Sequence, residues 1–452
     1  MKKKKANILT LGVPIFIQLL LFNFLSTIDT LMITDYNESL VIAINNAGQV
    51  TSMLNVLFSI CSTGVGIVIA QYLGAGKEED AKKSFNNGFL FNLILSLFLM
   101  VLLLFLQKPL LQLINCPEHF IPDAMQYLSI TCFGMPLYAM TYVLSANLRS
   151  YQRPGFITVI GVGSNLINVG LNYLLIYGKF GLPEMGIQGA AIATVVSQGI
   201  TFVLSLICTP FILKSRVYSL RFSWSHLKKI IFIGFPSALE SICYTVSGLF
   251  VTRVVNQLSE PEILARTYIN MIMSYIYQFS VAFGQANSIL VGHDVGKERY
   301  AEAKRNTYSS YLICFPILFM LIILLNLFGE DLIYLIVRNA KVYDPEEIVS
   351  AAVLILPWMF LYETGRCVNL IFINSLKAAG DVLFPLIGAI VCMFLFSSFG
   401  SWLLGIHFQM GFLGIFLAQA LDECARAVLM IARWQSNKWM NRSIVRTKEG
   451  AR

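Results

Sequence analysis

Residues 8–33 read ILTLGVPIFIQLLLFNFLSTIDTLMI and contain one charged side chain, Asp29. An α-helix needs about 20 mainly apolar residues to cross roughly 30 Å of hydrocarbon. This run is long enough to cross, and it lacks the small-residue cleavage site of a signal peptide. It therefore predicts a membrane-spanning helix with a carboxylate inside it.

Apolar runs of this kind recur along the whole chain. The 452 residues are 56% hydrophobic and 13% charged, whereas ordinary soluble domains contain about 25% charged residues. No soluble domain fits between the runs, so the predicted fold class is an all-α polytopic membrane protein. We expect twelve spanning helices, centred in 8–33, 47–73, 87–110, 122–147, 156–178, 186–210, 229–255, 265–292, 308–328, 348–373, 382–405 and 411–434.

Basic residues are distributed unevenly between the two sides. Most of the 33 Lys and Arg residues lie in the N-terminal flank, the even-numbered loops and the tail. The opposite loops contain only Lys108, Lys179, Arg266, Arg338 and Lys341. Because basic loops stay in the cytoplasm, both termini are predicted to be cytoplasmic. The net charge of +8 then reflects topology and contact with anionic lipid, and we expect no binding to nucleic acid.

Three sequence matches recur in the same order and at nearly constant separation. Gly12-Val13-Pro14 matches Gly234-Phe235-Pro236. Further on, QYLG at 71–74 matches HDVG at 293–296, and MGIQG at 185–189 matches MGFLG at 410–414. Matches in one order imply an internal duplication into two halves of six helices.

The duplication predicts the domain organisation. Because each half has an even number of spans, both halves cross the membrane in the same sense, which is the parallel 6+6 repeat arrangement of many carriers. We expect an N-terminal lobe over 1–212, a cytoplasmic interlobe linker over 213–228, a C-terminal lobe over 229–436 and a cytoplasmic tail over 437–452.

Polar side chains inside the N-terminal spans mark a first candidate site. A charged group at the bilayer centre costs at least about 2.5–3.5 kcal/mol on insertion scales, so it faces protein or water. Asp29 is the one carboxylate deep in a span of this half; Asn165, Asn168 and Asn172 share one face of the fifth span, and Thr194 lies in the sixth. Their oxygen atoms could bind Na⁺, or Asp29 could bind a proton. The alternative is that they only join helices by hydrogen bonds.

The C-terminal half has more charges within its spans, namely Glu240, Glu363, Arg366, Asp422, Glu423 and Arg426. Glu363 and Arg366 are three residues apart and Asp422 and Arg426 four apart, so these charges can neutralise one another on one helix face. Glu240 has no opposite charge nearby in its own helix. It is therefore the better candidate for the counter-charge of a cation or substrate.

These residues together resemble the multidrug and toxic compound extrusion (MATE) family of secondary transporters. The resemblance spans nearly the whole chain. It implies twelve helices in two lobes around a central cleft, and export of organic, often cationic compounds in exchange for H⁺ or Na⁺. It is carried by LGVPIFIQ and STIDTLMI in the first span, IAQYLGAGKEEDAKK after the second, NVGLNYLLIYG and MGIQGAAIAT in the fifth and sixth, GFPSALE in the seventh and SLKAAGDVLFP before the eleventh.

The resemblance also implies roles for individual residues. The family's first-span aspartate corresponds to Asp29, its fifth-span asparagine to Asn168, a sixth-span threonine to Thr194 and its seventh-span glutamate to Glu240. Position 172 is Asn where some members have Asp, which leaves Asp29 as the only ionisable member of the site and favours protons. In the tenth span some branches have an acid, whereas this chain has Arg366 with Glu363 one turn earlier.

The sequence thus predicts a monomeric, multi-pass transporter of the cell membrane that acts on small organic molecules. No nucleotide-binding P-loop, metalloprotease or hydrolase motif occurs, and the four histidines are dispersed. We therefore expect no enzymatic activity and no cofactor or metal other than a coupling H⁺ or Na⁺. The nine cysteines show no C-x-x-C spacing and are interpreted as packing residues.

Two other functions remain open at this point. A flippase for a lipid-linked oligosaccharide or a cell-wall precursor would need several basic residues to hold pyrophosphate, and the deep charges are Asp29 and Glu240 against Arg366 and Arg426. A channel would conduct steady current under voltage, whereas a carrier would show saturable counterflow.

Overall fold

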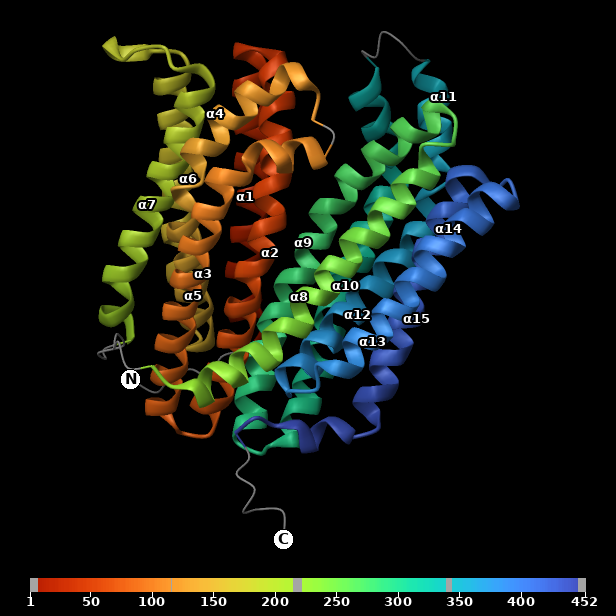
Figure 1. Ribbon diagram of the computed structural model, residues 1–452. Coiled ribbons are helices and arrows are strands. Elements are labelled where there is room, and N and C mark those ends of the chain that lie inside the picture. Colours follow the sequence, from red (N-terminus) through yellow and green to blue (C-terminus); the bar gives the residue numbers. More distant parts are fainter. Residues whose placement is uncertain (1–6, 115, 214–221, 339–343, 446–452) are drawn as a thin grey trace. The chain divides into compact units, whose positions relative to one another are not determined.

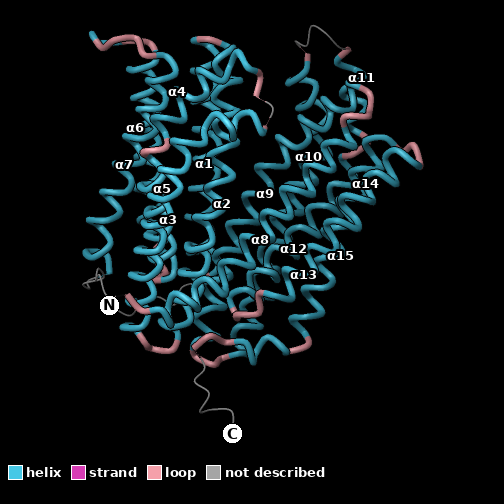
Figure 2. Tube along the Cα trace, in the orientation of Figure 1, coloured by secondary structure: helices cyan, strands magenta, loops and turns pink. Residues whose placement is uncertain are grey.

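The computed structural model describes residues 7–114, 116–213, 222–338 and 344–445. Every regular element in these ranges is helical, and the loops between the long helices are short (Figure 2). The first half contains α1 (Ile8–Tyr36), α2 (Glu38–Gly74), α3 (Glu78–Leu113), η1 (Glu118–Phe120), α4 (Ile121–Thr131), α5 (Gly134–Ser150), α6 (Pro154–Ile176), η2 (Lys179–Gly181) and α7 (Gly186–Leu213).

The second half continues with one long helix after another and ends in broken ones. Its elements are α8 (Trp224–Val255), α9 (Glu260–Gly296), α10 (Tyr300–Val337), α11 (Pro345–Val353), η3 (Leu356–Trp358), α12 (Met359–Ala378), α13 (Leu383–Cys392), η4 (Met393–Phe399), α14 (Gly400–Trp402), η5 (Leu403–His407), α15 (Gly411–Gln435) and η6 (Lys438–Arg442).

Each of the twelve expected spans lies in a helix or in a broken helix. Nine helical segments of the described chain are long and apolar enough to cross a membrane, and α4 with α5 forms a tenth that is bent by 52°. The fourth expected span, 122–147, is therefore two helices. The remaining two spans are α9 and α15, whose sequences contain more polar and charged residues.

Packing divides the chain into two compact units whose boundaries lie inside helices (Figure 1). One unit contains residues 17–238, and the other contains residues 1–16 with 239–452, as far as these are described. Each unit thus includes the first turns of the other half's first helix. The lobe boundaries predicted from the repeat are boundaries in sequence and stay a prediction; residues 214–221 of the linker and 446–452 of the tail lie outside the described chain.

Glycines explain why the start of α8 packs within the first unit. A Cβ at Gly234 would overlap the carbonyl oxygen of Ile60, and a Cβ at Gly64 would overlap that of Ile230. One glycine on each helix, packed against the carbonyl of an isoleucine on the other, lets the two backbones approach closely, as small residues do in other membrane helix pairs. In the second unit Gly12 of α1 has the matching role, because a Cβ there would lie 2.8 Å from the Phe283 ring of α9.

The sequence repeat is also a repeat of backbone conformation. Gly186 and Gly411, which begin α7 and α15, have positive φ angles of 50° and 58°, a conformation that glycine adopts without steric cost. Three residues later, Gly189 and Gly414 both lie against the backbone of the preceding helical segment, at Leu175 and Leu404. The duplicated motif therefore specifies the same turn and the same close helix contact twice.

The charged loops after α2 and α9 form a second repeated turn. The Lys77 N–H donates to the Tyr72 carbonyl at 2.9 Å, and the Arg299 N–H donates to the Asp294 carbonyl at 2.9 Å. The residue before each donor is left-handed, but it is a glycine in one loop and Glu298 in the other, with φ of 59°. Both loops thus close by the same hydrogen bond.

The cysteines agree with their interpretation as packing residues. All nine are free thiols, and Cys61, Cys116, Cys132, Cys314, Cys367 and Cys392 are buried.

Candidate functional site

Asp29 lies partly buried on the last two turns of α1 and forms a hydrogen bond to α6. The Asn172 Nδ2 donates to Asp29 Oδ1 at 2.8 Å. The threonines near Asp29 bond to their own helix instead: Thr27 donates to the Asn23 carbonyl and Thr30 to the Ser26 carbonyl. Of Thr27, Asp29 and Thr30, Asp29 is therefore the one whose described hydrogen bond reaches another helix.

The predicted face of α6 reaches Asp29 as a pair of buried amides. Asn168 and Asn172 are 5% and 2% exposed, and the Asn172 Nδ2 also lies 3.4 Å from Asn168 Oδ1. The Asn172 Oδ1 and the Asn168 Nδ2 have no hydrogen-bond partner among the described residues. Asn165 instead donates to the Gly161 carbonyl of its own helix at 3.0 Å.

Thr194 joins this cluster through a residue that the sequence analysis missed. Its hydroxyl donates to the Ala190 carbonyl at 2.9 Å, and its side chain lies close to the phenol of Tyr127 of α4, which is also near Asp29. Tyr127 packs with Ile33, Ile176 and Ala190, which places α4 beside α1, α6 and α7. One tyrosine in a short helix has no distinguishing pattern in sequence.

The first unit therefore contains a polar cluster of Asp29, Asn168, Asn172, Thr194 and Tyr127, hereafter the N-site. It offers one carboxylate, a buried amide oxygen without a partner, and hydroxyl groups. A carboxylate can take up a proton, and oxygen ligands are those that hard cations prefer. An unpaired buried amide oxygen is costly, so a bound cation or water would relieve it.

In the second unit, Glu240 has a counter-charge from a different helix. Its Oε2 lies 2.8 Å from Lys377 Nζ, at the end of α12, and both side chains are largely buried. Residue spacing within one helix cannot indicate a partner on another helix, so this ion pair was not predicted. Glu240 remains a candidate for substrate contact, but its charge is already balanced in this structure.

Glu363 and Arg366 form the ion pair expected from their spacing. The Arg366 Nη2 bonds to Glu363 Oε1, and its Nε donates to Glu363 Oε2 at 3.2 Å. The guanidinium also lies 4.8 Å from the ring centre of Tyr277 and 4.9 Å from that of Tyr362. Two aromatic faces therefore stabilise the buried cation in addition to the carboxylate.

Arg426 neutralises two acids of α15. Its Nη2 lies 2.7 Å from Asp422 Oδ2 and 2.8 Å from Glu423 Oε1, and its Nε donates to Asp422 Oδ1 at 3.1 Å. The Asn369 Nδ2 of α12 donates to Glu423 Oε2 at 3.0 Å. The prediction of mutual neutralisation between Asp422 and Arg426 is consistent with these contacts.

The charges of the second unit thus differ in kind from the N-site. We call the group of Glu363, Arg366, Asn369, Asp422, Glu423 and Arg426 the C-network. Its acids are all held by arginines, and Glu240 is held by Lys377. No described interaction joins Glu240 to Asp422. Asp29 is instead held by an uncharged amide.

The described fold and its intramembrane charges are those of a multi-pass membrane transporter. The MatE family model matches residues 14–174 and 236–403, one match in each half. These matches cover most of the sequence, and the chain belongs to the MATE family. Its twelve spans in two lobes are the fold of that family.

Relatives of known sequence are similar over almost the full length. An uncharacterised transporter, YisQ of Bacillus subtilis, is 29% identical and the match covers 98% of this chain and 96% of that protein. A probable multidrug resistance protein, NorM of Thermotoga maritima, is 25% identical over 92% of this chain and 89% of that protein.

A solved structure supports the fold. A mutant of the MATE transporter VcmN from Vibrio cholerae superposes with a TM-score of 0.87 at 16% identity, covering 96% of this chain and 98% of that one. As a member of the MATE family, the protein is a membrane-embedded transporter, as the sequence predicted.

Proposed function

We propose that this protein is a secondary active exporter that moves amphipathic organic cations out of the cell in exchange for H⁺ or Na⁺ bound at Asp29. The observation that carries the proposal is the N-site, where a partly buried carboxylate accepts a hydrogen bond from the Asn172 amide and forms no ion pair with a basic side chain of the described residues. A carboxylate without a basic partner can change its charge when an ion binds. The names of relatives as probable multidrug resistance proteins support a substrate class of varied organic compounds.

The coupling follows from the energetics of an intramembrane charge. An ion drives transport only if it binds one conformation more tightly than another. An ionised Asp29 is costly in a dry environment, and binding of H⁺ or Na⁺ removes that cost. Neutral Asp29 therefore favours a conformation in which α1 and α6 pack more closely, and alternating access results when the ion is released on the other side.

The contrast between the two units supports Asp29 as the coupling group. The acids of the C-network are bound by Arg366 and Arg426, so each would have to leave an arginine before binding an ion. The same pairing weighs against the alternative of a pyrophosphate-lipid flippase, because neither arginine is free to hold a phosphate.

Proteoliposomes that contain a fluorescent organic cation test the proposal. Efflux is measured under a pH gradient alone and under a Na⁺ gradient alone, and the gradient that drives it identifies the coupling ion. Asp29→Asn should abolish gradient-driven efflux. Asp35→Asn is the matched control on the same helix, since Asp35 bonds to Tyr177 outside the N-site, and it should transport normally. Near-normal efflux by Asp29→Asn would reject Asp29 as the coupling group.

A further inference from the structure

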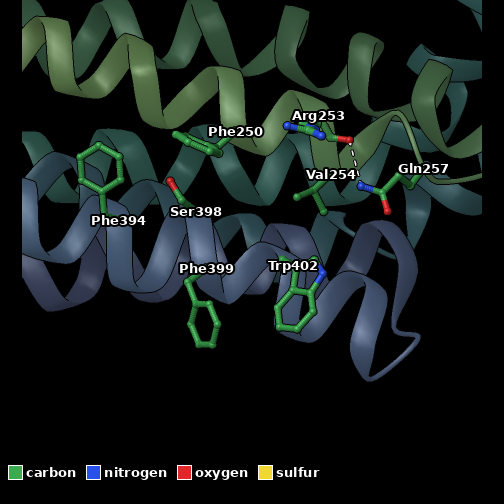
Figure 3. Close-up of a pocket in the computed structure, with 8 residues that line it drawn as sticks. All are labelled: Phe250, Arg253, Val254, Gln257, Phe394, Ser398, Phe399 and Trp402. Carbon is green, nitrogen blue, oxygen red and sulfur yellow. Dashed lines mark hydrogen bonds between the residues drawn. The ribbon is translucent and has the colours of Figure 1, made fainter.

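A groove of about 370 Å³ lies between α8 and the broken helix that contains η4 and α14 (Figure 3). It is lined by Phe250, Arg253, Val254, Gln257, Phe394, Ser398, Phe399 and Trp402, all in the second unit. Three of its aromatic side chains are about half exposed: Phe250 by 51%, Phe399 by 52% and Trp402 by 43%. None of these residues belongs to the N-site or the C-network.

Apolar atoms form nearly all of the groove surface, and Arg253 and Gln257 line one end of it, which we call the polar end. Figure 3 shows Phe250, Phe394 and Ser398 at one end and Gln257 and Trp402 at the other. Residues 250–257 and 394–402 run along helices in the same direction, so the groove is about 10–12 Å long at 1.5 Å per residue. By the predicted topology the end at Gln257 faces the outer surface and the end at Phe250 lies deeper in the hydrocarbon.

The polar end has a cation without a counter-charge. Arg253 is exposed in the last turn of α8, and no carboxylate in the described ranges forms an ion pair with it. A guanidinium at the membrane surface attracts anionic lipid headgroups and bonds well to phosphate oxygens. The charge repels an organic cation, so the transported substrate class proposed above is a poor occupant.

The backbone of the groove wall is unusual as well. Both π-helical segments of the described chain, η4 and η5, belong to this one broken helix, and such segments often mark functional sites. Below the groove, the buried Ser247 donates to the Met393 carbonyl at 3.3 Å and lies 2.8 Å from the Ser398 hydroxyl. This polar contact joins α8 to η4 beneath an opening lined by aromatic rings.

We propose that this groove binds one anionic glycerophospholipid of the outer leaflet. The phosphate pairs with Arg253 beside Gln257, and one acyl chain lies along Phe250, Phe394 and Phe399. Trp402 then contacts the upper part of the chain, as expected of an aromatic side chain at the membrane surface. The inference depends on the membrane topology and is independent of the transported compound.

Fluorescence quenching by brominated lipid tests the site in the full-length protein. The protein is reconstituted in phosphatidylcholine vesicles with a small fraction of phosphatidylglycerol, and either lipid has brominated acyl chains. The difference between the wild type and Trp402→Phe isolates the Trp402 signal. One basic residue near the surface should favour the anionic lipid by about fivefold. Arg253→Gln should remove the preference, and Arg338→Gln, another exposed arginine of an outer loop, should keep it.

Each other result overturns the proposal. Equal quenching of Trp402 by both brominated lipids would mean that the groove holds any lipid. Loss of the preference in Arg338→Gln as well would mean that overall charge, and not Arg253, attracts the lipid. Reversal of the quenching by excess inorganic phosphate would mean that Arg253 binds the free ion rather than a lipid.

Discussion

Replacement of Arg426 by methionine should strongly destabilise the second unit. The guanidinium lies 2.7 Å from Asp422 and 2.8 Å from Glu423, and it is 4% exposed. Methionine has a similar length but no charge, so both acids would stay buried without a cation. Removing one partner of a buried ion pair typically costs about 3–5 kcal/mol, which lowers the ratio of folded to unfolded protein by two to four orders of magnitude.

The free energy of unfolding is measured by titrating purified protein in mixed micelles with a denaturing detergent. Trp434 is fully buried, and its ring centroid lies 4.0 Å from that of Trp439, on which it stacks. Its fluorescence therefore reports unfolding of this unit. The control is Arg338→Met, an exposed arginine at the end of α10, which should change stability by less than about 0.5 kcal/mol.

A rescue variant separates loss of charge balance from loss of packing. Arg426→Met combined with Asp422→Asn and Glu423→Gln leaves no charge at these three positions of α15, and it should recover most of the stability. If Arg426→Met alone lowers the free energy of unfolding by less than 1 kcal/mol, the C-network is hydrated and the reasoning from burial is refuted. Failure of the triple variant to recover would show that shape, rather than charge, matters.

Three further predictions concern the repeat and the N-site. Gly234→Ala should cost about 1–3 kcal/mol, because its methyl group overlaps the backbone of α2; an unchanged unfolding midpoint would contradict this contact. Gly76→Ala should destabilise by about 1–2 kcal/mol and Glu298→Gly should stabilise, since both positions are left-handed; shifts of the same sign in the melting temperature would argue against the repeated turn. Asn172→Asp places a second carboxylate beside Asp29, and such pairs share one proton or bind a cation, so Na⁺ should drive efflux better in the proteoliposome assay than it does for the wild type.

The spans and the repeat could be predicted because they follow from local rules. Apolar length is a property of each segment, and the motif beginning at Gly186 recurs at Gly411 because both turns need a left-handed residue. Gly134 and Pro136 lie beside the bend between α4 and α5 and are residues that permit a bend, but they do not specify that the helix breaks there. Its hydrophobic pattern has the same appearance whether the helix is straight or broken.

Only the members of the N-site that are unusual within their own helix could be predicted from the sequence. Asp29, Asn168 and Asn172 are recognisable because polar groups are rare in hydrocarbon and the two amides share a helix face. Tyr127 and Lys377 are not, because tyrosine is common near membrane surfaces and Lys377 lies near the end of a span. Their roles depend on contacts between helices far apart in the chain, which no spacing within one helix can indicate.

Each compact unit includes the first turns of a helix that belongs to the other half of the sequence. This arrangement has a consequence for synthesis. The ribosome delivers residues 8–16 long before α9, the helix on which Gly12 packs. The first half likewise stays incomplete until residues 224–238 emerge and cover α2 at Gly64. A gene divided between α7 and α8 should therefore give two fragments that are each unstable when made alone and are recovered only when both are made in the same cell.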